Sequence, residues 1–283
     1  MPGKLACTVL KGPRRSNASG LPDPAAVTAC QEAGGSAADC LAPEDHIDSV
    51  LALDTATGRI RWATGVQGFD TWTLGCVLGP PPNNCPNNPG PDFDFGDGAH
   101  LFTIPDGHGR SRSVVGAGQK SGVYWALDAA TGHIIWSAAA GPGGGIGGIQ
   151  WGSATDGRRI YLAEADSYRI PYQLPDGQTV TSGSFAALDP ATGHILWQVA
   201  DPTGGVDTAA VTVANGVLFA GSLTGRMFAF NAATGQLLWQ FQGEGASSAG
   251  PAVAAGTVYW GNGYVRVPDG GIPSRTFYAF SIP

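Results

Sequence analysis

The sequence predicts an all-β protein built from repeated antiparallel sheets, and three observations lead to this fold class. First, the eleven-residue pattern A-x-D/N-x-x-T-G-x-x-x-W occurs four times. Second, 44 glycines and 21 prolines in 283 residues are typical of a turn-rich β protein. Third, no stretch sustains a 3.6-residue apolar period, so we expect almost no helix. The four copies of the pattern occupy residues 52–62, 126–136, 187–197 and 229–239.

Each copy of the pattern predicts a β-hairpin. An apolar strand enters Asp-x-x-Thr-Gly, where the Asp bonds the turn amides and the Gly takes the positive φ of a tight turn. The closing Trp offers a large ring that packs against the next copy. Trp197 and Trp239 are 42 residues apart, close to the ~40 to 45 residues of a four-stranded propeller blade. The repeat therefore predicts a β-propeller.

In chain order, residues 1–20 are expected to form an unstructured tail, because they are polar and lack the apolar core of a secretion signal. Residues 21–283 are expected to form a partial propeller domain that starts with a cysteine-stapled loop over residues 21–46. The strands expected outside the hairpins cover residues 99–104, 113–117, 159–165, 209–213, 217–220, 251–254, 258–261 and 277–282. They give about five blades, and we expect these to be part of a larger ring.

The five cysteines predict two local disulfides. Cys30 and Cys40 bracket a short Gly/Ala segment, and Cys76 and Cys85 bracket a rigid Pro-rich loop, which leaves Cys7 without an assigned partner. Two such bonds would place the protein in an oxidising compartment. The alternative is that all five are free thiols.

Charge and hydropathy exclude two classes of partner. The net charge is −7, and no basic run is longer than a pair such as Arg14-Arg15, which argues against nucleic acid. No apolar segment reaches the 18 residues that would suggest a membrane-spanning helix.

An acidic and aromatic insert at residues 68–98 is the first candidate functional stretch. It contains Asp70, Trp72 and three closely spaced carboxylates, where a scaffold would need only a turn. Insertions longer than about 12 to 15 residues are commonly functional. The alternative is that the carboxylates cap turns in a solvated loop. Those carboxylates are Asp92, Asp94 and Asp97.

The repeat and several further motifs together resemble one family. The repeat itself resembles that of quinoprotein dehydrogenases, eight-bladed propellers that hold pyrroloquinoline quinone (PQQ). The further motifs resemble the C-terminal part of polyvinyl-alcohol dehydrogenase and its relatives. These motifs are FDTWTLGC (69–76), NNCPNNPGPDFDFG (83–96), GAGQKSGVYWALD (116–128) and GGIQWGSATDG (147–157). The resemblance implies an eight-bladed ring and a periplasmic or secreted enzyme that oxidises secondary or polymeric alcohols with PQQ and Ca²⁺.

The resemblance also implies roles for individual residues. Asp94 stands where relatives have the carboxylate that takes the hydroxyl proton and lies at the metal, and Asp70 and Trp72 stand beside it in the cofactor site. Lys120 stands where a basic residue bonds the quinone oxygens, and Gln150-Trp151 matches an Asn-Trp pair at the cofactor. A cytochrome c would take the electrons.

Structural roles are the alternative for several of these residues. Lys120 would then be an ordinary hairpin lysine, and Trp151 would pack between blades. For the whole chain, the alternatives are a non-catalytic propeller used as a binding or assembly scaffold, and an inactive truncated fragment.

Overall fold

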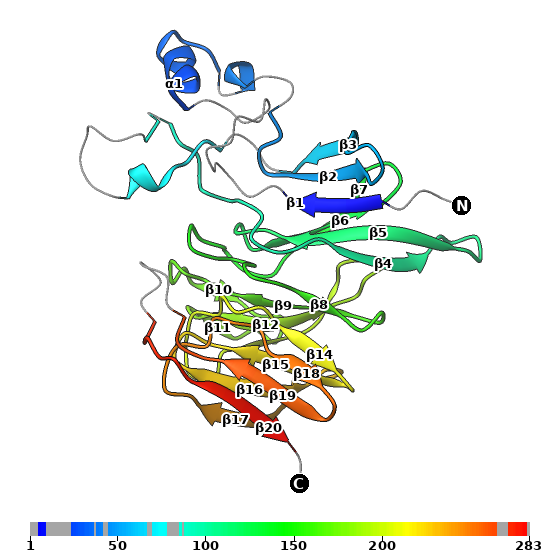
Figure 1. Ribbon diagram of the computed structural model, residues 1–283, viewed down its shortest axis with the longest axis vertical. Helices are drawn as coiled ribbons and strands as arrows, with labels where there is room; N and C mark the ends of the chain where they lie inside the picture. The colour runs from blue at the N-terminus through cyan, green and yellow to red at the C-terminus, as the bar shows by residue number, and fades with distance from the viewer. Residues whose placement is uncertain are drawn as a thin grey trace. The chain divides into compact units, whose positions relative to one another are not determined.

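The computed structural model divides the chain into two compact units, residues 1–95 with 131–133 and residues 96–130 with 134–283 (Figure 1). Each unit is described by itself. The described residues are 5–9, 24–36, 38–41, 45–66, 70–77, 85–86, 88–264 and 271–281.

The described residues of the first unit form one sheet and three short helical segments. Its sheet has the order β1 (Leu5–Val9), β2 (Ser49–Asp54), β3 (Ile60–Gly65), with antiparallel pairing throughout. β1 lies within the segment that we expected to be a tail, and it pairs with β2 from Asp54 to Val50. The 3₁₀ turns are η1 (Ala38–Cys40) and η2 (Leu74–Cys76).

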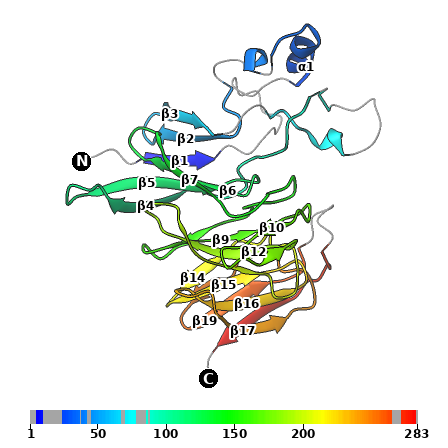
Figure 2. The ribbon, with the colours of Figure 1, turned by 180° about the vertical axis from the view of Figure 1, so that it is seen from behind.

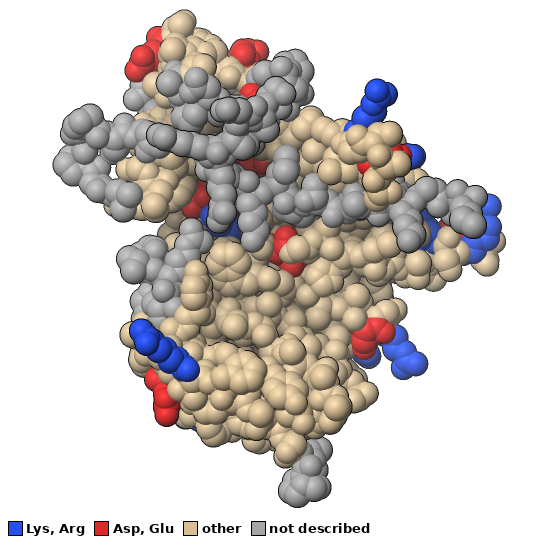
Figure 3. Space-filling model, in the orientation of Figure 1, with Lys and Arg blue, Asp and Glu red and all other residues tan. Residues whose placement is uncertain are grey.

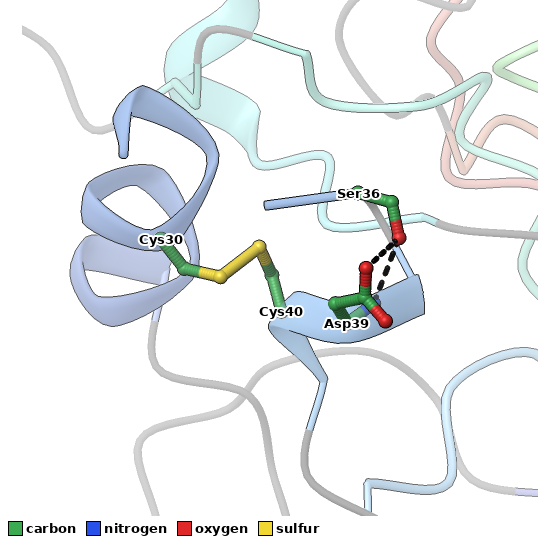
Figure 4. The surroundings of a disulfide bond; sticks show 4 residues. All are labelled: Cys30, Ser36, Asp39 and Cys40. Carbon is green, nitrogen blue, oxygen red and sulfur yellow. Dashed lines mark hydrogen bonds between the residues drawn. A yellow bond between two sulfur atoms is a disulfide. The ribbon is translucent and has the colours of Figure 1, made fainter. Parts of the chain in front are cut away.

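The α-helix α1 (Pro24–Glu32) forms where the sequence led us to expect a loop. Pro24 suits the first helical turn, and the alanines that follow have the highest helix propensity of all residues. The predicted Cys30–Cys40 disulfide is confirmed, and it ties α1 to η1 (Figure 4). Ser36 caps η1, because its hydroxyl accepts the Asp39 amide at 3.2 Å and donates to the Asp39 carboxylate at 2.5 Å. The Cys76–Cys85 disulfide is also confirmed.

The second unit consists of successive antiparallel sheets (Figures 1 and 2). The first is β4 (His100–Pro105), β5 (Ser111–Gly118), β6 (Val123–Asp128), β7 (Ile134–Ala139). The second is β8 (Ala154–Thr155), β9 (Ile160–Glu164), β12 (Ser184–Leu188), β13 (Ile195–Ala200), with the hairpin β10 (Tyr172–Gln173), β11 (Thr179–Val180) inserted. The third is β14 (Thr212–Ala214), β15 (Val217–Gly221), β16 (Arg226–Asn231), β17 (Leu237–Gln242), and the last is β18 (Ala252–Ala254), β19 (Thr257–Gly261), β20 (Phe277–Ser281).

In the second unit each strand pairs with the next along the sheet, and the first strands β4, β8, β14 and β18 adjoin one another. Sheets stacked in sequence with their first strands together are the arrangement of propeller blades. The all-β prediction is confirmed. Within the described parts of the chain, the two units form three four-stranded and two three-stranded sheets of this type, which agrees with the expected count of about five.

The repeat forms the predicted turn. The Asp189 carboxylate accepts the amides of Ala191 and Thr192 at 2.8 and 3.0 Å, and Gly193 has φ +74°. Every copy also places a register shift between its alanine and the next apolar residue, as between Ala187 and Leu188. A bulge at the same point of each copy gives each hairpin the same local twist.

The repeat Trp residues join neighbouring sheets. In the second unit, the Trp136 indole donates to the Pro190 carbonyl at 3.1 Å, and a Cβ on Gly193 would lie 2.5 Å from the Trp136 ring. Trp197 makes the same pair of contacts with Ala232 and Gly235. The turn of each repeat therefore lies on the Trp of the repeat before it, and the core consists of apolar clusters between successive sheets.

Candidate active site

In the first unit, Asp70 holds the acidic insert together. Its side chain is buried and accepts the Trp72 amide at 3.0 Å and the Phe93 amide at 2.7 Å. The second bond crosses the Cys76–Cys85 loop and fixes the backbone next to Asp94, which is half-buried. Asp70, Trp72 and Asp94 therefore lie in one local structure.

In the second unit, the Lys120 turn is hydrogen-bonded to Ile149, the residue before Gln150-Trp151. Lys120 is in the turn between β5 and β6, and the Gln119 carbonyl in that turn accepts the Ile149 amide at 3.1 Å. The Lys120 carbonyl accepts the Gly144 amide at 2.9 Å. Asp94 and Asp70 belong to the first unit, so the site residues fall into two groups.

Two buried amide side chains, one in the Lys120 turn and one next to Ile149, keep polar atoms that have no hydrogen-bond partner in the described part of the chain. They are Gln119 Nε2 and Gln150 Oε1. The Gln119 Oε1 is satisfied, because Ser121 Oγ donates to it at 2.7 Å and Trp125 Nε1 at 3.1 Å. Unsatisfied buried polar atoms cost about 1–3 kcal/mol each. A bound polar group is one way to satisfy this donor and this acceptor.

Asp97 is buried, so the alternative that this carboxylate caps a turn in a solvated loop is wrong. It accepts the Gly118 amide at 2.9 Å, and Ser153 donates to it through its amide at 2.8 Å and its hydroxyl at 2.7 Å. Burial raises the pKa of this carboxyl, against the opposing effect of His100, whose Nε2 lies 3.9 Å from Oδ1. Asp97 therefore ties the end of β5 to the start of β8, next to the Lys120 turn.

Sequence reasoning missed a group of buried acids at the ends of strands in the second unit. Burial raises the pKa of Glu164 to about 7 and raises the pKa values of Asp166 and Asp207. For Asp207 the neighbouring Asp201 adds to the effect of burial. Glu164 is the last residue of an apolar strand, Asp166 follows that strand, and Asp207 lies in a Gly-rich connection, and the sequence gives no further signal. Among the described residues, no three or more His, Cys, Asp or Glu side chains are grouped so as to hold a metal ion.

A family model described as outer membrane protein assembly factor BamB matches residues 35–259 and 181–281, and its repeat is of the PQQ type. The chain belongs to the PQQ-type β-propeller repeat family. Within this family, it is 32% identical over 241 residues to a polyvinylalcohol dehydrogenase from Pseudomonas sp.. It is 32% identical over 250 residues to one from Sphingopyxis sp. (strain 113P3). The matches cover 77% and 78% of this chain but span only 36% and 37% of the relatives.

Solved structures support the propeller fold. The quinohemoprotein alcohol dehydrogenase from Comamonas testosteroni matches with a TM-score of 0.57 at 18% identity, over 83% of this chain and 40% of that one. A europium-containing methanol dehydrogenase matches with a TM-score of 0.55 at 16% identity, over 77% and 45% of the two chains.

The two disulfides and the relatives together indicate an extracytoplasmic protein. None of the helices that the structure describes has the length and apolar character to cross a membrane.

Proposed function

We propose that this chain forms the C-terminal part of a PQQ-dependent alcohol dehydrogenase of the polyvinyl-alcohol type, acting in the periplasm or outside the cell. The observation that supports the proposal is the backbone contact between the Lys120 turn and the segment that leads into Gln150-Trp151, where two buried amide atoms have no hydrogen-bond partner among the described residues. The names of the two relatives at 32% identity supply the substrate class, secondary and polymeric alcohols.

The residues of the Lys120 turn fit one edge of a quinone cofactor. Lys120 would bond the quinone oxygens, and Gln119 Nε2 and Gln150 Oε1 would supply a donor and an acceptor. Trp151, half-buried, would give a flat apolar wall. When bound, PQQ supplies the acceptor for a hydride equivalent. No complete calcium site is formed by the residues that the structure describes, so further ligands would have to join Asp94 at the metal.

Asp94 would take the hydroxyl proton of the alcohol. A general base has to be held within hydrogen-bond reach of that proton. The Asp70 bonds to the Trp72 and Phe93 amides fix the backbone on which Asp94 stands. Electrons would leave to a cytochrome c.

Dye-linked turnover of a secondary alcohol with added PQQ and Ca²⁺ tests this function. We expect turnover with the wild-type chain and a loss of at least about 100-fold in Asp94→Asn, because a positioned base contributes about 10²- to 10⁴-fold. Asp189→Asn is the matched control, since Asn231 occupies the equivalent turn position in the fourth repeat. Equal turnover in wild type and Asp94→Asn would contradict the role of Asp94. Absence of turnover in the wild type would favour the scaffold function.

A further inference from the structure

The second unit contains a groove of about 600 Å³ that includes none of the residues assigned to the cofactor. It lies between residues 139–142 at the end of β7 and the β10–β11 hairpin. This hairpin is labelled in Figure 1, next to β9 and β12. The equivalent connection in the next sheet is the short turn between Gly221 and Arg226. The groove therefore exists because residues 165–183 are inserted between β9 and β12.

The groove is held in shape by hydrogen bonds. The Tyr172 hydroxyl donates to the Ser182 carbonyl at 3.0 Å and lies 2.8 Å from the Ser184 hydroxyl. Gln198 Nε2 donates to the Ala140 carbonyl at 2.6 Å and to Ser184 Oγ at 2.8 Å. Both protons of the Gln198 amide are thus used, which leaves its Oε1 as the acceptor that the floor can offer a ligand.

The lining is amphiphilic and uncharged. Leu174, Ile195 and two prolines give apolar surface, while Gln198 and Gln173 give neutral hydrogen-bonding groups. No lining residue carries a charge, and the face drawn in Figure 3 is likewise mostly uncharged. Pockets of about 300–1,000 Å³ with apolar walls and a few polar groups are typical ligand sites. Such a lining gives no counter-ion to an anionic or cationic ligand, and it suits a chain that alternates aliphatic carbons with hydroxyls.

The groove is joined to the Lys120 turn by backbone hydrogen bonds. The Ala140 amide donates to the Gly122 carbonyl at 2.8 Å, and the Gly144 amide donates to the Lys120 carbonyl at 2.9 Å. The wall residue Ala140 and the nearby Gly144 are therefore both hydrogen-bonded to the turn that carries Lys120. A polymer bound in the groove would lie beside the cofactor edge proposed above.

We infer that this groove is a binding subsite for a neutral polyhydroxylated chain, a segment of poly(vinyl alcohol), outside the reacting centre. The choice of polymer rests on the proposed function. The groove binds hydroxyls through Gln198 and Gln173 and covers the methylene groups with Leu174 and Ile195. The groove raises the affinity for the polymer and takes no part in the chemical step.

Binding of short poly(vinyl alcohol) to the full chain without PQQ tests the inference independently of turnover. Ala139→Trp places a ring in the groove, and Ser137→Trp is its control, because Ser137 is exposed on the same face of β7 two residues away and does not line the groove. We expect Ala139→Trp to weaken binding by at least about tenfold and Ser137→Trp to leave it within about twofold. Poly(ethylene glycol), which lacks hydroxyls along its chain, should bind at least about tenfold more weakly than poly(vinyl alcohol).

Steady-state kinetics separate this inference from the proposed function. In Ala139→Trp, KM for the polymer should rise by about tenfold, while kcat/KM for a short secondary alcohol stays that of the wild type. Polymer binding that Ala139→Trp leaves unchanged would overturn the subsite even if the chain turns over alcohols. Groove-dependent binding without turnover would uphold the subsite and count against the enzymatic function.

Discussion

The sheet of β8, β9, β12 and β13 and the sheet of β14–β17 end in the same repeat, yet their Trp residues differ. Trp197 is 9% exposed and donates to the Ala232 carbonyl in the next repeat. Trp239 is 38% exposed and contacts Phe241 and Phe280 through ring faces and edges. The following sheet has three strands, and within the described residues no strand pairs with the second edge of β20. Burial of a repeat Trp is therefore supplied by the next copy of the turn.

The largest expected effect on the free energy of unfolding comes from removing a Trp that the next repeat covers. Trp197→Ala should lower the free energy of unfolding by about 3–5 kcal/mol, the usual cost of an aromatic-to-alanine change in a core. Trp239→Ala should cost about 1–2 kcal/mol, because the ring is already partly in water. Urea unfolding of the two variants measures both values. Equal losses would show that the next repeat does not supply the burial.

The same two sheets differ at the end of their second strand, where one has Glu164 and the other Gly221. Burial raises the pKa of Glu164 from 4.5 to about 7, so the folded state keeps a proton that the unfolded chain releases. The contribution of Glu164 to the free energy of unfolding is therefore fully present below pH 4.5. It falls by roughly 3 kcal/mol as the pH rises through about 7.

Glu164→Gln should remove that pH dependence, since the amide does not titrate. Unfolding free energies at pH 4.5 and pH 7.5 for the wild type and the variant give the difference. Asp166 adds a like charge that also raises the Glu164 pKa, so Asp166→Asn should shrink the pH effect without abolishing it. An identical pH profile in the wild type and Glu164→Gln would contradict the account.

A smaller effect is expected at the turn glycines. Gly235 and Gly216 both have positive φ, +73° and +78°, so alanine is strained at either. A Cβ at Gly235 would also lie 2.7 Å from the Trp197 ring, whereas at Gly216 nothing lies within 4 Å. Gly235→Ala should cost about 2 kcal/mol and Gly216→Ala about 1 kcal/mol. Thermal unfolding of both variants checks the order, and a larger loss in Gly216→Ala would reverse it.

The sequence predicted the turns and the disulfides, because these features depend only on residues that are close together in the chain. The Asp-x-x-Thr-Gly turns needed only an Asp side chain and a Gly at fixed spacing, and both disulfides closed short segments. α1 was missed because its residues are small and show no apolar stripe.

Burial of single acids could not be predicted, because it depends on residues far away in the chain. Asp97 is satisfied by Ser153, 56 residues away in the sequence. The groove is formed by three separate segments, around Ala140, Leu174 and Gln198. Asp94 and Lys120 were named from a resemblance, and their roles are still predictions.

We propose that the stacked repeats hold Lys120 and Gln150-Trp151 as one edge of a PQQ site. Thermal unfolding with PQQ and Ca²⁺ measures whether this site forms, because a ligand that binds only the folded state raises Tm. We predict a rise in Tm with the wild-type chain and none in Lys120→Ala, with Arg158→Ala, an exposed site, as the control. A Tm unchanged by PQQ in the wild type, or raised equally in Lys120→Ala, would contradict the claim.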